Sequence, residues 1–269
     1  MAILDTISER RSVRTFDKKW LSEEHAKAIL SYAEKAKNPY NLPISWKLLN
    51  ADEHGLSSPV IVGTNLWIAG KLERLPHAEE AFGYSFEQVV LYAKSIGVGT
   101  TWIAGTMNRG AFEKAMGLSE NEVLPCVSPL GYPAAKMSIR ETLMRKGVKG
   151  DSRFPFDEIF FDNDFSTPLS EEKTGKLKDA FEAVRLAPSA VNKQPWRVVL
   201  SGNRVHFYEW HSKGFLEGDW DIQKIDMGIA ICHFEAILIE RGINASFEIA
   251  DPGLSTPSNV SYIASFVLE

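Results

Sequence analysis

Two long stretches of the chain have apolar residues at the spacing of one helical face. Between residues 79 and 96 apolar side chains recur every three or four positions, for example at Phe82 and Phe86, which predicts a helix that ends at Gly97. Residues 221–241 repeat this pattern and are again followed by a glycine. The pattern therefore predicts two similar helices in the two halves of the chain.

Shorter elements lie between these helices. Helices are predicted over residues 2–10, 22–37 and 109–116, and Ser22 is expected to be an N-cap because two glutamates follow it. From residue 138 to residue 164 the pattern weakens. The expected strands are residues 46–49, residues 59–62, a segment ending at Ile103, residues 123–130, residues 196–199 and residues 262–267.

The order helix, strand, strand, helix, strand occurs twice. Leu169–Glu172 echoes Leu21–Glu24, and Trp196–Val199 echoes Trp46–Leu49. We therefore expect an α+β architecture of two fused repeats, residues 1–150 and residues 151–269, joined by an exposed linker over residues 146–151.

Composition narrows the class of protein. The chain has 269 residues, 44% of them hydrophobic and 24% charged, which is ordinary for a soluble globular protein. A net charge of −5 argues against a general nucleic-acid binder. Cys126 and Cys232 lie in apolar sequence and are expected to be buried thiols, not a disulfide. Because we find no signal segment and no membrane-spanning apolar run, we expect a cytoplasmic protein.

The first candidate site is the segment Arg10-Arg11-Ser12-Val13-Arg14. Three guanidinium groups and a hydroxyl are the donors that a phosphate monoester prefers. A solvated basic helix end, favoured by the helix dipole, is the alternative, and for this segment alone it is the better supported one.

The second candidate site is Pro188-Ser189-Ala190-Val191-Asn192-Lys193-Gln194-Pro195-Trp196. Pro188 ends the preceding helix, and the polar residues that follow present donors and acceptors in a tight turn. An isoalloxazine ring needs such groups along its N3, O2 and O4 edge. An ordinary helix-to-strand turn is the alternative, but this particular order of residues favours the flavin interpretation.

Together these segments resemble the nitroreductase-like FMN-dependent oxidoreductases. Two more segments are similar to that family: residues 97–105, which resemble its strand leading to the flavin, and Gly131–Lys136, which resembles its Gly-Tyr-Pro segment. The resemblance implies that a backbone N–H of Ala104 or Gly105 approaches flavin N5. It also implies that the cofactor is bound by Arg10, Arg11, Ser12, Arg14, Lys136, Arg140, Pro188, Ser189, Ala190, Asn192 and Gln194.

In the family each flavin site takes the arginine segment from one subunit and the Pro-Ser-x-x-Asn segment from the other. Here the first half has Asn38–Pro43 in place of the second motif, and the second half has Glu158–Asp162 in place of the first. A carboxylate there would repel a phosphate. We therefore expect a nitroreductase-like fold of two degenerate repeats forming an intrachain pseudo-dimer, with one FMN per chain. The chain is expected to be a monomer of this kind or a weak homo-oligomer.

The resemblance implies a ping-pong reaction in which NAD(P)H reduces the flavin at N5 and a nitroaromatic, a quinone or a similar small acceptor reoxidises it. A flavin-binding protein without turnover is the main alternative. The same fold with different chemistry, such as dehalogenation or flavin fragmentation, is another. A purely structural protein would leave both motifs unexplained. No dinucleotide fingerprint or hydrolase elbow is present, and no metal site is predicted, because His206 and His211 lack companions at ligand spacing. His233 is expected to be a core or interface residue.

Overall fold

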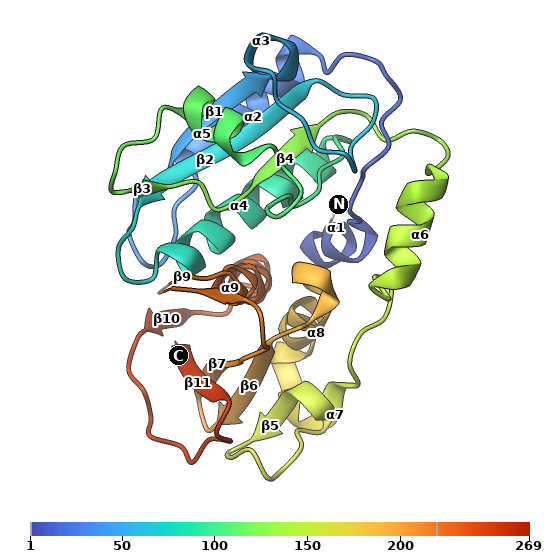
Figure 1. Ribbon diagram of the computed structural model, residues 1–269. Coiled ribbons are helices and arrows are strands. Elements are labelled where there is room, and N and C mark those ends of the chain that lie inside the picture. Colours follow the sequence, from blue (N-terminus) through green and yellow to red (C-terminus); the bar gives the residue numbers. More distant parts are fainter. Residues whose placement is uncertain (1, 219) are drawn as a thin grey trace. The chain divides into compact units, whose positions relative to one another are not determined.

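The computed structural model describes residues 2–218 and 220–269 (Figure 1). Its contacts divide the chain into two compact units. The N-terminal unit is Glu9–Gly150, and the C-terminal unit is Asp151–Glu269 together with most of helix α1 (Ile3–Glu9). The sequence analysis assigned α1 to the first half. The structure places it with the C-terminal unit, where the Ile3 N–H donates to Glu240 Oε1 at 2.7 Å.

The N-terminal unit is built around an antiparallel sheet in which the central strand pairs with all of the others. Its strands are β1 (Ser45–Asn50), β2 (Leu66–Glu73), β3 (Glu122–Val123) and β4 (Val127–Leu130). Gly70 of β2 lies opposite Trp46 of β1 and leaves room for the indole ring, since a Cβ at Gly70 would lie 2.5 Å from Trp46 Cζ3. The close packing of this pair explains a glycine in the middle of a strand.

Helices cover this sheet. Ser22 caps the first of them, because its hydroxyl accepts the N–H of His25 at 3.2 Å. Helix α4 is buried along most of its length and ends before Gly97, whose φ of +81° suits a glycine. The helices of this unit are α2 (Glu23–Lys35), α3 (Ala51–His54), α4 (Ala78–Ser95), α5 (Arg109–Met116) and α6 (Ile139–Gly147).

The C-terminal unit has a five-stranded sheet in the order β10-β11-β7-β6-β5, antiparallel except for the parallel pair β5–β6. These strands are β5 (Phe160–Asp162), β6 (Trp196–Ser201), β7 (Arg204–Trp210), β10 (Ala245–Glu248) and β11 (Val260–Leu268). Strands β8 (Leu216–Glu217) and β9 (Trp220–Asp221) form a separate ribbon. The helices are α7 (Phe156–Ile159), η1 (Glu171–Leu177), α8 (Lys178–Leu186), η2 (Ala190–Asn192) and α9 (Gln223–Glu240).

Aromatic side chains fill the core of this unit. The ring of Phe234 on α9 meets those of Phe181 on α8 and Phe207 on β7 edge to face, with centroids 5.8 and 5.4 Å apart. All three are fully buried. Such contacts fix α9 against both α8 and the sheet, and α9 supplies one residue of the candidate site described below.

The expected internal repeat is confirmed by the order of elements. Helix α2, strands β1 and β2, helix α4 and an extended segment occur in this order in the N-terminal unit, with α3 between the two strands. Elements α8, β6, β7, α9 and β10 occur in the same order in the C-terminal unit, with η2 before β6 and the ribbon β8–β9 before α9. In each unit the two successive strands pair antiparallel. The chain therefore has an α+β fold built from two related units.

Several expected elements differ from the structure. Residues 59 and 60 lie in a turn, in which Ile61 N–H donates to Ser58 O, and Val62 forms only an isolated bridge with Thr15, so the strand predicted over residues 59–62 is wrong. The segment ending at Ile103 forms only isolated bridges, and Pro125 divides the strand expected over residues 123–130. The expected linker begins too early, since α6 continues to Gly147. No helix in the described part of the chain is both long and apolar enough to cross a membrane.

Candidate flavin site

The arginine segment of the N-terminal unit is held in an extended conformation by backbone pairing. Ser12 forms a parallel bridge with Thr100, and the Val13 N–H donates to the Thr100 carbonyl at 2.8 Å. The Val13 side chain is buried and touches Gly99, where an added Cβ would lie 3.0 Å from it. Because side chains alternate along an extended chain, burial of Val13 directs Ser12 and Arg14 to the opposite side.

Arg10 is held by a buried carboxylate. Its Nε lies 3.7 Å from Oε1 of Glu87 on α4, and its side chain is only 6% exposed. The other carboxylate oxygen of Glu87 accepts the indole N–H of Trp102 at 3.0 Å. Burial lowers the pKa of Arg10, and Glu87 opposes that shift. Glu87 thus links the arginine segment to α4 and to the extended segment before Ala104.

A second buried carboxylate, Glu141 on α6, faces the same segment. Its Oε2 accepts the hydroxyl of Thr15 at 2.8 Å, and its Oε1 accepts Arg11 Nη1 at 3.4 Å. Ser138 caps α6 through the Glu141 N–H, and its own N–H donates to Thr15 Oγ1. This network fixes the start of α6 beside the arginine segment.

Several charged groups of this cluster act on one another. Burial lowers the pKa of Arg14, with Glu141 opposing the shift, and the charge of Arg145 lowers the pKa of both Arg10 and Arg14. The guanidinium groups of Arg10, Arg11 and Arg14 thus share the carboxylates of Glu87 and Glu141. Among the described residues the buried Nε atoms of Arg10 and Arg14 have no hydrogen-bond acceptor. Such a cluster suits a dianion.

The two basic residues expected downstream lie differently. Lys136 is exposed, and Arg140 is exposed and donates to the carbonyl of Pro59. Arg145, one turn after Glu141 on α6, is instead the residue of this helix whose charge acts on the arginines. Sequence reasoning missed Glu87, Glu141 and Arg145. The i, i+4 spacing of Glu141 and Arg145 is the signal that could have indicated a shared helix face.

Ala104 and Gly105 follow the bridge between Ile103 and Val127, at the end of the extended segment. Ala104 is half-buried and Gly105 is exposed. Within the described part of the chain, neither backbone N–H donates a hydrogen bond. Both groups are therefore available as donors to a ligand.

The Pro-Ser-x-x-Asn segment lies in the C-terminal unit and is bent sharply. Val191, Asn192 and Gln194 all have left-handed backbone conformations, with φ of +42°, +59° and +49°. A left-handed conformation is uncommon for a residue other than glycine and most unfavourable for a β-branched residue such as Val191. The turn therefore keeps this shape only because its surroundings impose it.

Hydrogen bonds around the turn show how it is imposed. The Ser189 hydroxyl accepts the Gln194 N–H at 2.8 Å, and the Ala190 N–H lies 3.1 Å from each carboxylate oxygen of Asp226 on α9. The side-chain carbonyl of Gln194 accepts the Phe154 N–H at 2.9 Å. The turn is thus tied to itself, to α9 and to the start of the C-terminal unit.

The side chain of Asn192 also has partners within this unit. Its amide nitrogen donates to Ser152 O at 3.1 Å and to Ser152 Oγ at 3.3 Å, and its carbonyl oxygen accepts Arg153 Nη1 at 3.5 Å. The Arg197 guanidinium donates to Gln194 O at 3.1 Å and lies 4.9 Å from the Trp210 ring centroid, and burial lowers the pKa of Arg197 to about 10. Asn192 is therefore oriented by Ser152 and Arg153.

A scan of the chain against protein families now adds an independent finding. The family described as "Putative TM nitroreductase" matches residues 2–237. The chain belongs to this nitroreductase family. No curated protein matches the chain.

One solved structure of a putative nitroreductase agrees with this fold over the whole chain. A "putative nitroreductase" from Thermotoga maritima is 20% identical, covers 100% of this chain and 94% of its own, and has a TM-score of 0.64. A "putative nitroreductase in complex with fmn" from Desulfovibrio desulfuricans is 20% identical, with a TM-score of 0.42, and spans 57% of this chain and 98% of its own. A "Putative NADH dehydrogenase/NAD(P)H nitroreductase" from Bacteroides thetaiotaomicron is 24% identical, with a TM-score of 0.43, and spans 51% and 89%. Thus the first covers the whole of this nitroreductase-family chain and the other two about half of it.

Two segments of this nitroreductase-family chain stand in place of the two motifs and differ from them in their contacts. In the N-terminal unit, Asn38 closes its own loop by donating to Leu42 O at 2.8 Å and accepting the Leu42 N–H at 3.2 Å. In the C-terminal unit, Phe160 is buried in the aromatic core, and Asp162 pairs with Lys173. Neither segment presents a cluster of guanidinium groups.

One histidine set aside in the sequence analysis lies among carboxylates. His211 Nδ1 is 3.3 Å from Glu209 Oε1 and 3.6 Å from Asp221 Oδ2, and its Nε2 is 2.9 Å from Ser261 Oγ. These groups could also hold a metal ion. Of these companions, Glu209 lies on β7, two residues before His211, and Asp221 lies on β9, ten residues after it. The absence of a metal site stays a prediction.

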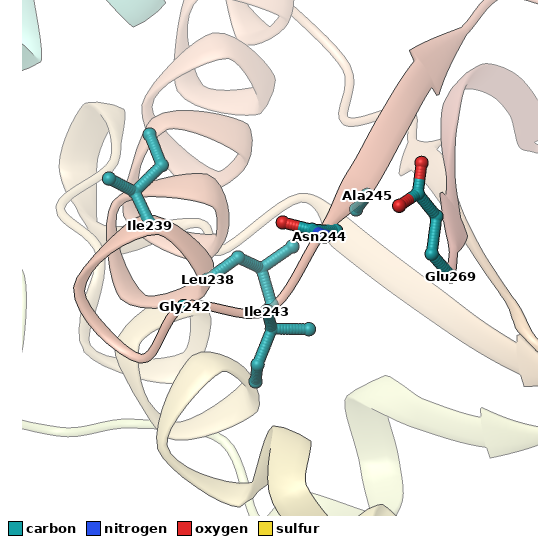
Figure 2. A pocket seen from close by; sticks show the side chains of 7 residues that line it. All are labelled: Leu238, Ile239, Gly242, Ile243, Asn244, Ala245 and Glu269. Atoms are coloured by element: carbon teal, nitrogen blue, oxygen red, sulfur yellow. The ribbon is translucent and has the colours of Figure 1, made fainter.

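Two surface hollows of the C-terminal unit lie apart from the flavin segments. One of about 410 Å³ lies where α9 ends, between Ile239, Gly242 and Ile243 on one side and Glu269 on the other (Figure 2). The other, also about 410 Å³, is lined by Phe156 and by charged residues of η1 and α8. Neither hollow contains a residue of the predicted flavin site.

Proposed function

We propose that this chain is an FMN-dependent NAD(P)H oxidoreductase that reduces a nitroaromatic, a quinone or a similar small acceptor. The observation that carries the proposal is the arginine cluster of the N-terminal unit. The segment brings three guanidinium groups together, and the buried Nε atoms of Arg10 and Arg14 have no hydrogen-bond acceptor among the described residues. Such donors suit a phosphate monoester, which has close to two negative charges. Membership of the nitroreductase family supports the same cofactor.

Each group of residues has a separate role in this proposal. Arg10, Arg11, Ser12 and Arg14 bind the phosphate, with Arg145 adding charge and Lys136 and Arg140 lying nearer to solvent. The turn of Pro188, Ser189, Ala190, Asn192 and Gln194 binds the polar edge of the ring, and the N–H of Ala104 or Gly105 donates toward N5. One FMN per chain uses all of these groups.

When bound, FMN supplies hydride transfer through N5, first from NAD(P)H and then to the acceptor. The protein contributes binding and charge. The phosphate would neutralise the positive charge of the arginine segment, and the donors near N5 orient the ring. No protein nucleophile is required. We further propose that the chain acts as a monomer, because it contains both motifs.

The first experiment is the visible absorption spectrum of the purified protein, with the released flavin identified and counted per chain. The proposal expects about one FMN. Anaerobic addition of NADH or NADPH should bleach the flavin band, and addition of a nitroaromatic or a quinone should restore it. Failure to bind added FMN would overturn the proposal, whereas binding without bleaching would favour a non-catalytic flavoprotein.

A further inference from the structure

One buried carboxylate holds the predicted flavin turn. Asp226 lies in the first turns of α9 and is 4% exposed, and both of its carboxylate oxygens lie 3.1 Å from the Ala190 N–H. A hydrogen bond within the turn also holds Ala190, because its carbonyl accepts the Lys193 N–H at 3.1 Å. Ala190 is therefore anchored between α9 and the rest of the turn.

Asp226 is a buried carboxylate in largely apolar surroundings. It is followed along α9 by buried residues, including Met227, Ile229 and Ile231. A carboxylate in such surroundings is unfavourable unless it accepts hydrogen bonds. Burial raises the pKa of Asp226 well above its ordinary value, the negative charge of Asp221 adds to the rise, and the Ala190 N–H opposes it.

The turn that Asp226 holds is strained immediately after Ala190. Val191 has φ of +42° and ψ of +31° although it is β-branched, and its side chain is 57% exposed, so packing does not hold it there. Asn192 and Gln194, the polar side chains of the motif, follow in the same left-handed region. A tether on Ala190 acts at the point where this strained conformation begins.

We propose that Asp226 is a positioning residue that fixes the 189–194 turn, through the Ala190 N–H, in the conformation that binds the flavin ring. This inference rests on the proposed function, because it names what keeps that binding site in shape. Asp226 itself touches the turn and is not proposed to touch the flavin.

The test compares two replacements of Asp226. Asp226→Asn keeps a side-chain acceptor for the Ala190 N–H, whereas Asp226→Leu has a similar size and no acceptor. Loss of this buried acceptor should weaken FMN binding about tenfold, measured by quenching of flavin fluorescence, and Asp226→Asn should stay close to the wild type. Glu80→Gln is the control for loss of a buried carboxylate, since Glu80 is 2% exposed and lies 3.3 Å from His77 Nδ1, not from a turn residue.

A second variant separates positioning from general stability. Asparagine adopts left-handed backbone far more readily than valine, so Val191→Asn should restore most of the FMN affinity lost in Asp226→Leu. A merely structural role of Asp226 would not be rescued by relief of strain at Val191. Equal FMN affinity in wild type and Asp226→Leu, or equal loss in Asp226→Asn and Asp226→Leu, would overturn the proposal.

Amide hydrogen exchange tests the contact between Asp226 and Ala190 separately from FMN binding. The Ala190 N–H should be protected in the wild type and in Asp226→Asn without flavin, and should exchange faster in Asp226→Leu. If the wild type binds no FMN, the proposed function fails, and this exchange measurement shows separately whether Asp226 holds the turn. Unchanged exchange in Asp226→Leu would refute the tether itself.

Discussion

Thr15 donates its hydroxyl to the buried carboxylate of Glu141 at 2.8 Å, which joins the arginine segment to the start of α6. The same carboxylate is the partner of Arg11. Glu141 therefore partly compensates a cluster that is otherwise positive. It also couples the shape of the predicted phosphate site to a helix more than 120 residues later in the chain.

Glu141→Gln should lower the free energy of unfolding by about 1–3 kcal/mol, because a charged partner of the arginines is lost from a buried position. Inorganic phosphate should restore more stability to this variant than to the wild type, since the anion replaces the missing charge. Urea unfolding with and without phosphate measures both effects. Glu120→Gln removes the same charge from an exposed site and should change neither value.

Replacement of Arg14 by Glu, or of Asn192 by Leu, should each weaken FMN binding, whereas Asp162→Asn should not. Arg14 belongs to the arginine cluster, and Asn192 to the strained turn, while Asp162 pairs with Lys173. Ser152→Ala controls for the loss of one Asn192 partner. Intact binding in Asn192→Leu would contradict the use of both segments by one flavin.

Gly70→Ala should destabilise the N-terminal unit by about 1–3 kcal/mol, because the new methyl group would meet the Trp46 ring at 2.5 Å. Gly110→Ala is the matched control. Gly110 lies in α5 with open space around it, so alanine there should raise the stability by about 0.5 kcal/mol. Thermal unfolding of both variants provides the comparison. Equal stability of the two would refute the close packing of β1 on β2.

Stability should fall on mild acidification because of His206. Burial lowers the pKa of His206, and Arg204 lowers it further, so the native state binds fewer protons than the unfolded state below about pH 6.5. The stabilisation is present above that pH and is lost as the pH falls toward the lowered pKa, by at most about 1.4 kcal/mol per pH unit. His206→Asn should flatten this part of the curve, and His54→Asn, at an exposed site, should leave it unchanged.

Elements with clear start and stop residues could be predicted from the sequence. Ser22, Gly97 and the two long stretches rich in apolar residues predicted helices close to those observed. Strand β2 was missed because its residues are buried on both faces, which removes the alternation of a half-exposed strand. Strand β7 was missed because it contains His206 and Glu209, whose burial only the folded unit explains.

The candidate site was predictable where its residues are adjacent in the chain. The order of residues within Arg10–Arg14 predicts phosphate binding, and the order within Pro188–Trp196 predicts binding of the flavin ring. The buried partners of these segments could not be predicted. Glu87, Glu141 and Asp226 are single acidic residues on helices, and such a pattern predicts exposed charges. Only the folded structure shows that each of these carboxylates accepts a hydrogen bond from a site segment or forms an ion pair with it.

Helix α1 belongs to the C-terminal unit although it comes first in the chain. The chain therefore passes from one unit to the other twice, after Ser8 and after Gly150. A gene divided at residue 150 would not yield two complete repeats, since the second product would lack a helix that its own core requires. A protein cut once near residue 150 would by contrast keep its two units covalently joined between Ser8 and Glu9. The arginine segment begins directly after that connection.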